Sequence, residues 1–237
     1  MTPRRYLAFD IETAKLLPPD VSDLHAHRPL GIACAAAFAL DSGEVSTWHG
    51  VTAAGSPAPQ MSREEATALV ADLQRHVDDG YTLVTWNGLS FDFDILAEES
   101  GAREACAALA VAHVDMMFHV VCTKGHFLGL QTAASGMGLD GKLSGVSGAD
   151  APQLWADGEF EKVLAYCVQD VRATAELAAA GDQARELRWR SQRGKSATMA
   201  LPDGWVSVTA ALQIPEPDTS WMSSPPRRDG LLRWTRG

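Results

Sequence analysis

The stretch "YLAFDIETAK", residues 6–15, decides the fold, because an apolar run typical of a buried strand leads directly into two carboxylates. Side chains alternate along a strand, so Asp10 and Glu12 are expected to project from the same face. Two like charges on one face repel each other unless protons or cations intervene. The stretch therefore suggests a site for a divalent metal ion, while a solvated strand end would show the same two residues.

The Asp-x-Glu pattern has little specificity by itself. A chain of this length contains about one such pattern by chance. A second one, Asp157-Gly-Glu159, occurs here with no strand before it. Other parts of the chain have to decide between a metal site and a solvated strand end.

Composition places the chain among ordinary globular proteins. It has 237 residues, of which 46% are hydrophobic and 21% charged, as in one sizeable domain or a domain with an appendage. No apolar stretch approaches the roughly 20 residues that span a bilayer, and the run after Met1 is too short for a secretory signal. The four cysteines lie on apolar segments without Cys-x-x-Cys spacing, which indicates buried free thiols. We expect a cytoplasmic protein with no membrane partner.

The formal net charge of −10 argues against broad electrostatic adhesion to nucleic acid or anionic membranes. A nucleic-acid enzyme is still compatible, because cations held by carboxylates reverse the local charge. One positive cluster surrounds Trp189 and consists of Arg185, Arg188, Arg190, Arg193 and Lys195. Such a run is more often an exposed basic face at a helix end than a contact surface.

The order of the expected elements indicates an α/β fold. Strands are predicted over residues 6–11, 31–40, 44–49, 81–86 and 112–116. Helices are predicted over residues 62–77, 92–100, 128–138 and 159–180, with a short Ala-rich helix after Gly101. The turn Asp41-Ser42-Gly43 joins the second and third strands as a hairpin, so the first three strands are expected to be antiparallel neighbours. Alternating helices and strands then complete a mixed sheet with helices on its faces.

Two later stretches are expected to lack regular structure. Residues 139–149 are rich in Gly and Ser and predict a loop. Gly181 is expected to end the long helix of residues 159–180. Beyond the domain of residues 1–192, the composition changes to Pro, Gly, Ser and Trp, so residues 193–237 are predicted to form a C-terminal arm with at most a short helix near 206–212. Its three tryptophans indicate that the arm packs on the domain or on a partner.

Two further stretches place polar residues where ligands bind. In "VTWNGLSFDFDIL", residues 84–96, Asn87 stands at the C-terminal end of a strand, where open α/β sheets hold their ligands. Asp92 begins a helix, where it is either a functional acid or a helix cap, and Asp94 competes with it. In "YCVQDVRATAEL", residues 166–177, Tyr166 and Asp170 lie on one helical face, and a core-facing Asp170 needs a partner or a cation.

In this order, the three stretches resemble the exonuclease motifs of the DEDD superfamily, and the tyrosine resembles the mark of its DEDDy branch. The segments "FDIET", "WNGLSFDFDIL" and "YCVQDVRATAEL" look like the proofreading exonuclease domain of family B DNA polymerases and its free-standing relatives. The match spans about residues 5–180. It implies a ribonuclease H-like mixed five-stranded sheet flanked by helices, and a two-metal 3′-to-5′ exonuclease. The histidine branch carries His where this chain has Ala165.

The resemblance also implies a role for each matching residue. Two Mg²⁺ or Mn²⁺ ions would be held by four carboxylates, Asp10, Glu12, Asp92 and Asp170. Tyr166 would orient the attacking water. The terminal nucleotide would be contacted by Thr13, Asn87 and Phe91. For Phe91 a core position fits equally well.

The expected substrate is the 3′ end of single-stranded nucleic acid. DNA is the first expectation, with RNA trimming or structure-specific cleavage as the alternative, since the motifs do not record the sugar. A nucleic-acid binding module with a degenerate site is the third reading. The chain has no polymerase domain, so a protein partner bound through residues 193–237 stays open.

Overall fold

A mixed five-stranded sheet forms the central layer of the protein, with strand order β3-β2-β1-β4-β5. The structure, a computed structural model, describes residues 4–18, 21, 24–139, 147–191 and 194–236. The strands of the central sheet are β1 (Tyr6–Thr13), β2 (Ile32–Ala39), β3 (Glu44–His49), β4 (Thr82–Thr85) and β5 (Val114–Asp115). β1 pairs antiparallel with β2 and parallel with β4, so the predicted mixed sheet and the predicted β2–β3 hairpin are confirmed.

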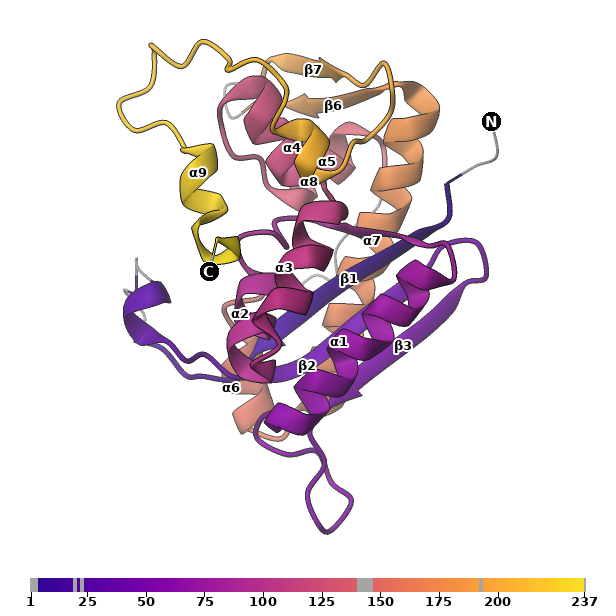
Figure 1. Ribbon diagram of the computed structural model, residues 1–237, viewed down its shortest axis with the longest axis vertical. Helices are drawn as coiled ribbons and strands as arrows, with labels where there is room; N and C mark the ends of the chain where they lie inside the picture. Colours follow the sequence, from indigo (N-terminus) through magenta and orange to yellow (C-terminus); the bar gives the residue numbers. More distant parts are fainter. Residues whose placement is uncertain (1–3, 19–20, 22–23, 140–146, 192–193, 237) are drawn as a thin grey trace.

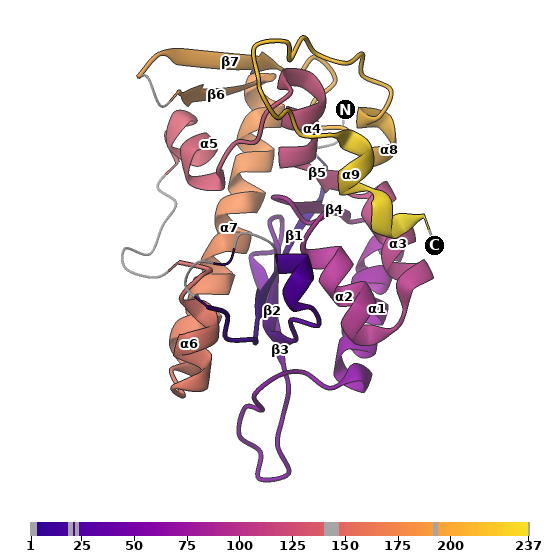
Figure 2. The same ribbon diagram turned by 90° about the vertical axis from the view of Figure 1, so that its left-hand side faces the viewer.

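Helices cover both faces of this sheet. The described helices are η1 (Leu24–His27), α1 (Arg63–Asp78), α2 (Asp92–Ser100), α3 (Arg103–Ala112), α4 (Met116–Lys124), α5 (Leu130–Gly136), α6 (Ala151–Ala156), α7 (Phe160–Ala184), α8 (Val208–Ala211), α9 (Arg228–Leu231) and η2 (Arg233–Thr235). Figure 1 shows α1, α2 and α3 on one face of the sheet, and Figure 2 shows α7 on the other. In the part of the chain that the structure describes, no helix is long and apolar enough to cross a membrane.

The alternation of side chains along β1 divides the core into two clusters. Leu7, Phe9 and Ile11 pack with the helices α1, α2 and α3. Tyr6 and Ala8 lie on the opposite face, in the cluster that contains the apolar side of α7. Asp10 and Glu12 continue this second series, so strand geometry alone directs both carboxylates toward α7.

Capping residues in the local sequence set the start of α1 and the end of α2. Ser62 caps α1 through a capping box with Glu65, and Gly101 ends α2 in the left-handed conformation with φ 71°. The helix expected over residues 128–138 is shorter, and of the loop expected over residues 139–149 the residues 140–146 lie outside the described part of the chain.

The C-terminal end of α7 differs from the expectation. Gly181 was expected to end the helix, but α7 continues to Ala184. A Cβ atom on residue 181 would lie 2.6 Å from Trp205 Nε1, so the missing side chain leaves room for the indole. Trp205 is fully buried there and donates from Nε1 to the Ala178 carbonyl at 3.1 Å. Tertiary packing thus overrides the poor helix propensity of glycine.

A second sheet follows α7 where the sequence predicted an extended segment. Strands β6 (Glu186–Arg190) and β7 (Ser196–Ala200) form an antiparallel hairpin that joins the two sides of the boundary placed at residue 192. Arg188 and Arg190 therefore lie on a strand, and the interpretation as a helix end was wrong for them. Arg193 lies outside the described residues.

The rest of the C-terminal arm runs back over the domain. The predicted short helix near residues 206–212 is present as α8. Trp205 and Trp234 are buried in the two core clusters, whereas Trp221 is 67% exposed. The end of the arm approaches α2 and α3, as Figure 1 shows in yellow.

Candidate active site

Asp10 and Glu12 meet α7 at the middle of that helix. Glu12 is buried and Asp10 is partly buried, which does not fit a solvated strand end. Cys167 Sγ on α7 lies 3.6 Å from the Asp10 carbonyl oxygen and 3.7 Å from Asp10 Oδ2. The expectation of buried free thiols is confirmed for all four cysteines, but the position of Cys167 beside Asp10 was not foreseen.

Four carboxylates from three segments interact at this point. Burial raises the pKa of Asp10 well above its usual value, and the charges of Asp92, Glu12 and Asp170 raise it further. The pKa of Glu12 is also raised, first by burial and then by Cys34, Asp170 and Asp92. Buried carboxylates that repel one another in this way are stabilised by protons or by cations. The four acids singled out in the sequence therefore lie in one electrostatic cluster.

Asp92 is oriented by the neighbouring strand. Its Oδ1 accepts a hydrogen bond from the Ile11 backbone N–H at 2.9 Å. Phe91 occupies the N-cap position of α2 without a side-chain cap bond, so the alternative of Asp92 as the helix cap was wrong. Burial raises the pKa of Asp92 to about 7, against the hydrogen bond from Ile11, which lowers it.

Tyr166 lies beside Asp170 and is almost fully buried. Burial raises the pKa of Tyr166, and the charge of Asp170 and a hydrogen bond to it raise it further, so the phenol keeps its proton at neutral pH. Gly148 lies over the same place, since a Cβ atom on it would be 3.8 Å from Glu12 Oε2 and 3.9 Å from the Tyr166 hydroxyl. Gly148 thus borders the carboxylate cluster.

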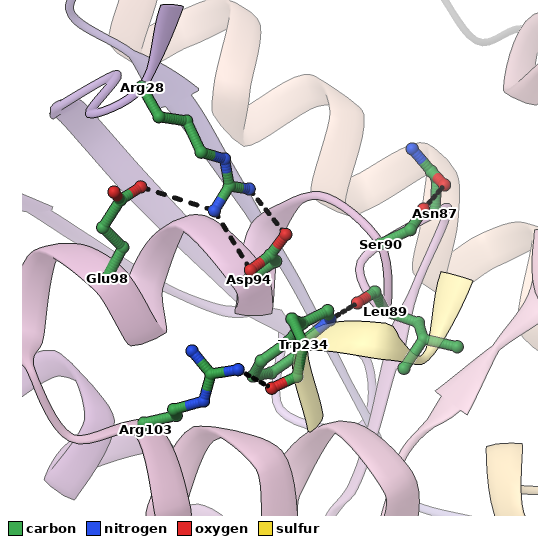
Figure 3. A network of polar contacts seen from close by, with 8 residues as sticks. All are labelled: Arg28, Asn87, Leu89, Ser90, Asp94, Glu98, Arg103 and Trp234. Carbon is green, nitrogen blue, oxygen red and sulfur yellow. Dashed lines mark hydrogen bonds and ion pairs between the residues drawn. The ribbon is translucent and has the colours of Figure 1, made fainter. Parts of the chain in front are cut away.

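Asp94 is bound by Arg28, so it is not an alternative to Asp92 as the functional acid. Arg28 Nη2 donates to Asp94 Oδ2 at 2.6 Å, and Arg28 Nη1 donates to Asp94 Oδ1 at 3.1 Å and to Glu98 at 3.4 Å. Figure 3 shows this fork. A bidentate pair of this kind is among the stronger ion pairs of proteins. Asp94 therefore anchors η1 and its flanking segment to α2.

The turn between β4 and α2 is held by polar contacts from two sides. Asn87 has φ 75°, in the left-handed region, and its Oδ1 accepts from Ser90 Oγ at 2.6 Å. The Leu89 carbonyl accepts from Trp234 Nε1 of the C-terminal arm at 2.6 Å (Figure 3). The Trp234 carbonyl in turn accepts from Arg103. This turn leads directly into Asp92.

Asp115 also supports the turn between β4 and α2, a structural role that the sequence did not predict. Its carboxylate accepts backbone hydrogen bonds from Asn87 at 3.1 Å, Leu89 at 2.9 Å and Phe118 at 2.9 Å. Burial raises the pKa of Asp115 to about 6, although these hydrogen bonds lower it. The only signal in the sequence was its position between a short strand and a helix in "HVDMM".

A threonine and a histidine complete the support. Thr85 Oγ1 accepts from the Gly88 N–H at 3.0 Å and lies 2.9 Å from His113 Nε2. His113 Nδ1 lies 2.6 Å from the Ala110 carbonyl, so Nδ1 carries the proton and Nε2 accepts from Thr85. Burial lowers the pKa of His113 to about 4, which keeps this arrangement at neutral pH.

The three expected nucleotide contacts lie on the segments that carry Glu12 and Asp92. Thr13 is the last residue of β1, directly after a register shift that follows Glu12. Phe91 precedes Asp92 and packs partly against the core, as its alternative interpretation allowed. Asn87 begins the turn that leads to Asp92. Thr13 and Phe91 are thus adjacent in sequence to Glu12 and Asp92.

The donor set fits a hard divalent cation. Carboxylate oxygens are the ligands that Mg²⁺ and Mn²⁺ prefer. Ligand atoms of Asp10, Glu12 and Cys167 lie within 4.8 Å of one another. Asp92 and Asp170 add their charges to the same place. The residues present therefore suit metal binding, with one soft sulfur beside the oxygens.

Comparisons with known proteins agree with this fold. A search among curated proteins finds no match. The solved structure of the family B DNA polymerase from the hyperthermophilic archaeon Pyrobaculum calidifontis is similar, with a TM-score of 0.50 and 19% identity, over 76% of this chain and 24% of that chain. The chain thus spans about a quarter of that polymerase, and the likeness concerns the fold.

A family model gives the assignment. The model described as RNase_H superfamily matches residues 56–180, from the segment before α1 to most of α7. The matched range contains Asp92, Tyr166 and Asp170, while β1 with Asp10 and Glu12 precedes it. Because the model covers just over half of the residues, the chain belongs to the RNase H superfamily.

Proposed function

We propose that the protein is a metal-dependent 3′-to-5′ exonuclease that hydrolyses phosphodiester bonds at the end of single-stranded nucleic acid, with DNA as the first expected substrate. The observation that carries the proposal is the electrostatic cluster of Asp10, Glu12, Asp92 and Asp170, which come from β1, α2 and α7. Acids that raise one another's pKa values in a buried cluster are a frequent mark of a functional site. Membership of the RNase H superfamily supports nuclease chemistry.

The four acids would hold two Mg²⁺ or Mn²⁺ ions. Bound divalent ions would activate a water molecule and stabilise the charge that develops on the phosphodiester oxygens. The hydrogen bond from Ile11 would hold the Asp92 carboxylate in a fixed orientation. The turn held by Asp115 and Trp234 would keep that carboxylate in place.

Tyr166 would act through its protonated hydroxyl. Its raised pKa keeps the phenol neutral, so the hydroxyl is able to hold a water molecule by a hydrogen bond without adding charge. The terminal nucleotide would be contacted by Thr13, Asn87 and Phe91. In Figure 3 the side-chain nitrogen of Asn87 points away from Ser90, while its oxygen takes the Ser90 hydrogen bond.

Cleavage of 5′-labelled strands tests the proposal. Single-stranded DNA and RNA of one sequence are incubated with Mg²⁺, Mn²⁺ or EDTA, and the products are resolved over time. A metal-dependent ladder that shortens from the 3′ end is expected from the wild type and from Asp157→Asn, which changes the exposed acid of the second Asp-x-Glu pattern. Asp10→Asn should abolish the ladder.

Each contrary outcome has a clear meaning. Near-normal cleavage by Asp10→Asn would exclude the carboxylate cluster as the active site. Products that start from the 5′ end would exclude the proposed direction. Metal-independent binding without cleavage of either strand would favour the nucleic-acid binding module.

A further inference from the structure

Positive charge is concentrated in the segment that follows α7. Residues 185–195 contain five basic residues and one acidic residue, a formal charge of +4 in a chain whose net charge is −10. The catalytic proposal uses none of these residues. A cationic surface on an acidic protein is a candidate binding site for an anionic ligand.

The β6–β7 hairpin presents part of this charge on one face. Leu187 and Trp189 are buried, so Arg188 and Arg190 alternate with them and point outward. Across the ladder, Thr198 pairs with Arg188 and Ser196 pairs with Arg190. Both hydroxyl residues are exposed. The outer face of the hairpin thus carries guanidinium and hydroxyl groups side by side, which are common donors to phosphate oxygens.

Among the described residues, the arginines of the hairpin have only one weak ion pair, so they are available to an external anion. Arg188 has one exposed acidic neighbour, Glu186, at 3.6 Å, and exposed pairs of this kind are weak. Among the residues that the structure describes, no carboxylate forms an ion pair with Arg190. Within the described part of the chain, the Arg190 guanidinium therefore has no carboxylate partner.

This outer face of the hairpin forms one side of a groove, and helix α5 forms the other. The groove has a volume of about 470 Å³, with Arg188, Arg190, Ser196 and Thr198 on one side and Thr132 and Ser135 on the other. This volume lies within the usual range of ligand sites, roughly 300–1,000 Å³. Gln131 also lines it, and its buried Oε1 lacks a hydrogen-bond partner among the described residues. As far as the structure describes the chain, the groove therefore offers several donors and a buried acceptor, Gln131 Oε1, without a partner.

A glycine sets the distance between the two walls. A Cβ atom on Gly136 would lie 2.1 Å from the Arg188 carbonyl oxygen and 2.4 Å from Trp189 Cα. The end of α5 therefore touches the backbone of β6 directly. The Arg188 N–H also lies 3.3 Å from Met137 Sδ. The groove is a fixed feature of the fold at this end.

The groove lies at a defined distance from the carboxylate cluster. Asp170 and the hairpin are joined by the second half of α7, which spans about 21 Å at 1.5 Å per residue. Figure 2 shows α5 and the hairpin together at this end of α7. α5 packs against both α7 and β6. A strand with its 3′ end at the cluster would need at most about six nucleotides to reach the groove, at the 3.4 Å per nucleotide of a stacked strand, and fewer if the strand is extended.

We propose that this groove, between α5 and the β6–β7 hairpin, binds the phosphate backbone of the strand whose 3′ end is cleaved, within about six nucleotides upstream of that end. Arg188 and Arg190 contact phosphates, the hydroxyl groups of the walls add hydrogen bonds, and Gln131 accepts one from a sugar hydroxyl or a base amino group. This inference rests on the proposed exonuclease function and gives that function a second binding site.

Binding in EDTA tests the groove apart from catalysis. The affinity for a labelled single strand of about 15 nucleotides is measured by fluorescence anisotropy at several salt concentrations. Arg188→Ala/Arg190→Ala should weaken binding roughly tenfold and reduce the salt slope by about 0.7 for each lost phosphate contact. Arg190→Ala alone, which breaks no ion pair among the described residues, should give about half the change in slope.

A matched control separates a local effect from loss of net charge. Arg63→Ala/Arg75→Ala removes the same charge from α1, which covers the other face of the sheet, and should leave the salt slope within error. An equal loss in this variant would overturn the groove, because the effect would then come from net charge. Unchanged binding by Arg188→Ala/Arg190→Ala would also overturn it.

Cleavage in Mg²⁺ distinguishes this inference from the proposed function. The hairpin variant should raise KM for the long strand and leave a strand of about two nucleotides unaffected, because the short strand does not reach the groove even when extended. If the variant treats both lengths like the wild type, the groove inference fails and the exonuclease stands. If the wild type cleaves neither length but binding still depends on Arg188 and Arg190, the exonuclease fails and the groove stands.

Discussion

Trp234 donates from Nε1 to the carbonyl of Leu89 at 2.6 Å and so ties the C-terminal arm to the turn that leads into Asp92 (Figure 3). The two residues are 145 positions apart in the sequence. The Leu89 N–H is held by Asp115, so both backbone polar groups of this residue are satisfied by distant segments. The arm therefore supports the candidate active site.

Trp234→Phe tests this support by removing the donor and keeping an aromatic ring. The Leu89 carbonyl would lose its buried partner, which costs about 1–3 kcal/mol of unfolding free energy. Urea denaturation should show this loss, and cleavage should show a lower kcat/KM. Trp221→Phe is the control, since Trp221 in the same arm is largely exposed. Equal behaviour of the two variants would exclude a specific role for Trp234.

Asp115→Asn should loosen the same turn from the other side. The amide group replaces one acceptor oxygen with a donor, so at least one of the three backbone N–H groups loses its bond. We expect a loss of about 2 kcal/mol in urea denaturation, given that bonds to charged groups contribute about 1.5–3 kcal/mol. Asp157→Asn, at an exposed position, serves as the control. If Asp115→Asn is as stable as the wild type, the turn does not depend on the hydrogen bonds of Asp115.

Asp92→Asn should change the pH dependence of the metal-free protein. The folded-state pKa of Asp92 is raised to about 7 from 3.8, so between these values the folded state binds a proton that the unfolded state releases. Its contribution to stability is therefore present below pH 3.8 and is lost as the pH rises toward 7. In EDTA, the wild type should lose more unfolding free energy between pH 5 and pH 8 than Asp92→Asn. The asparagine is still able to accept from Ile11, so parallel curves would contradict the raised pKa.

Added metal should show the complementary effect. A cation has to displace the proton of Asp92 below pH 7, so Mg²⁺ should raise the unfolding temperature of the wild type more at pH 8 than at pH 6. For a chain of this size each kcal/mol corresponds to roughly 2–4 °C. Asp10→Asn should respond weakly at both pH values. A response of the same size in wild type and variant would place the bound metal elsewhere.

Tyr166→Phe should slow cleavage and spare metal binding. The variant keeps the buried ring on α7 and removes only the hydroxyl beside Asp170. We expect kcat to fall by about 100-fold, the lower end of the range for one positioned acid or base group, with an unchanged Mg²⁺ titration. An unchanged kcat would remove the water-orienting role.

Gly181→Ala should destabilise the protein although alanine favours helices. The new Cβ would lie 2.6 Å from Trp205 Nε1, and overpacking of a buried site costs about 1–3 kcal/mol. Urea denaturation measures the loss. Gly230→Ala in α9 is the control, because no atom lies within 4 Å of its Cβ position and the change should be neutral or stabilising. A stabilised Gly181→Ala would show that Trp205 moves at little cost.

The sequence by itself determined the central sheet and the candidate carboxylates. Strand alternation is a local property, so residues 6–13 alone direct Asp10 and Glu12 to one face. Helical spacing likewise brings Tyr166 and Asp170 to one face of α7. Capping signals are local too, and they set the start of α1 and the end of α2.

Only the tertiary structure decided the choices that depend on distant partners. Asp92 and Asp94 both lie in the first turn of α2, and the structure separates their roles because Arg28 binds Asp94 from 66 residues away. Gly181 is a helix-ending signal by propensity, and the helix continues because Trp205 fills the space beside it. Cross-strand pairing of β6 with β7 and the contact of Trp234 with Leu89 likewise join segments whose sequences carry no mutual signal, because such contacts depend on packing rather than on periodicity.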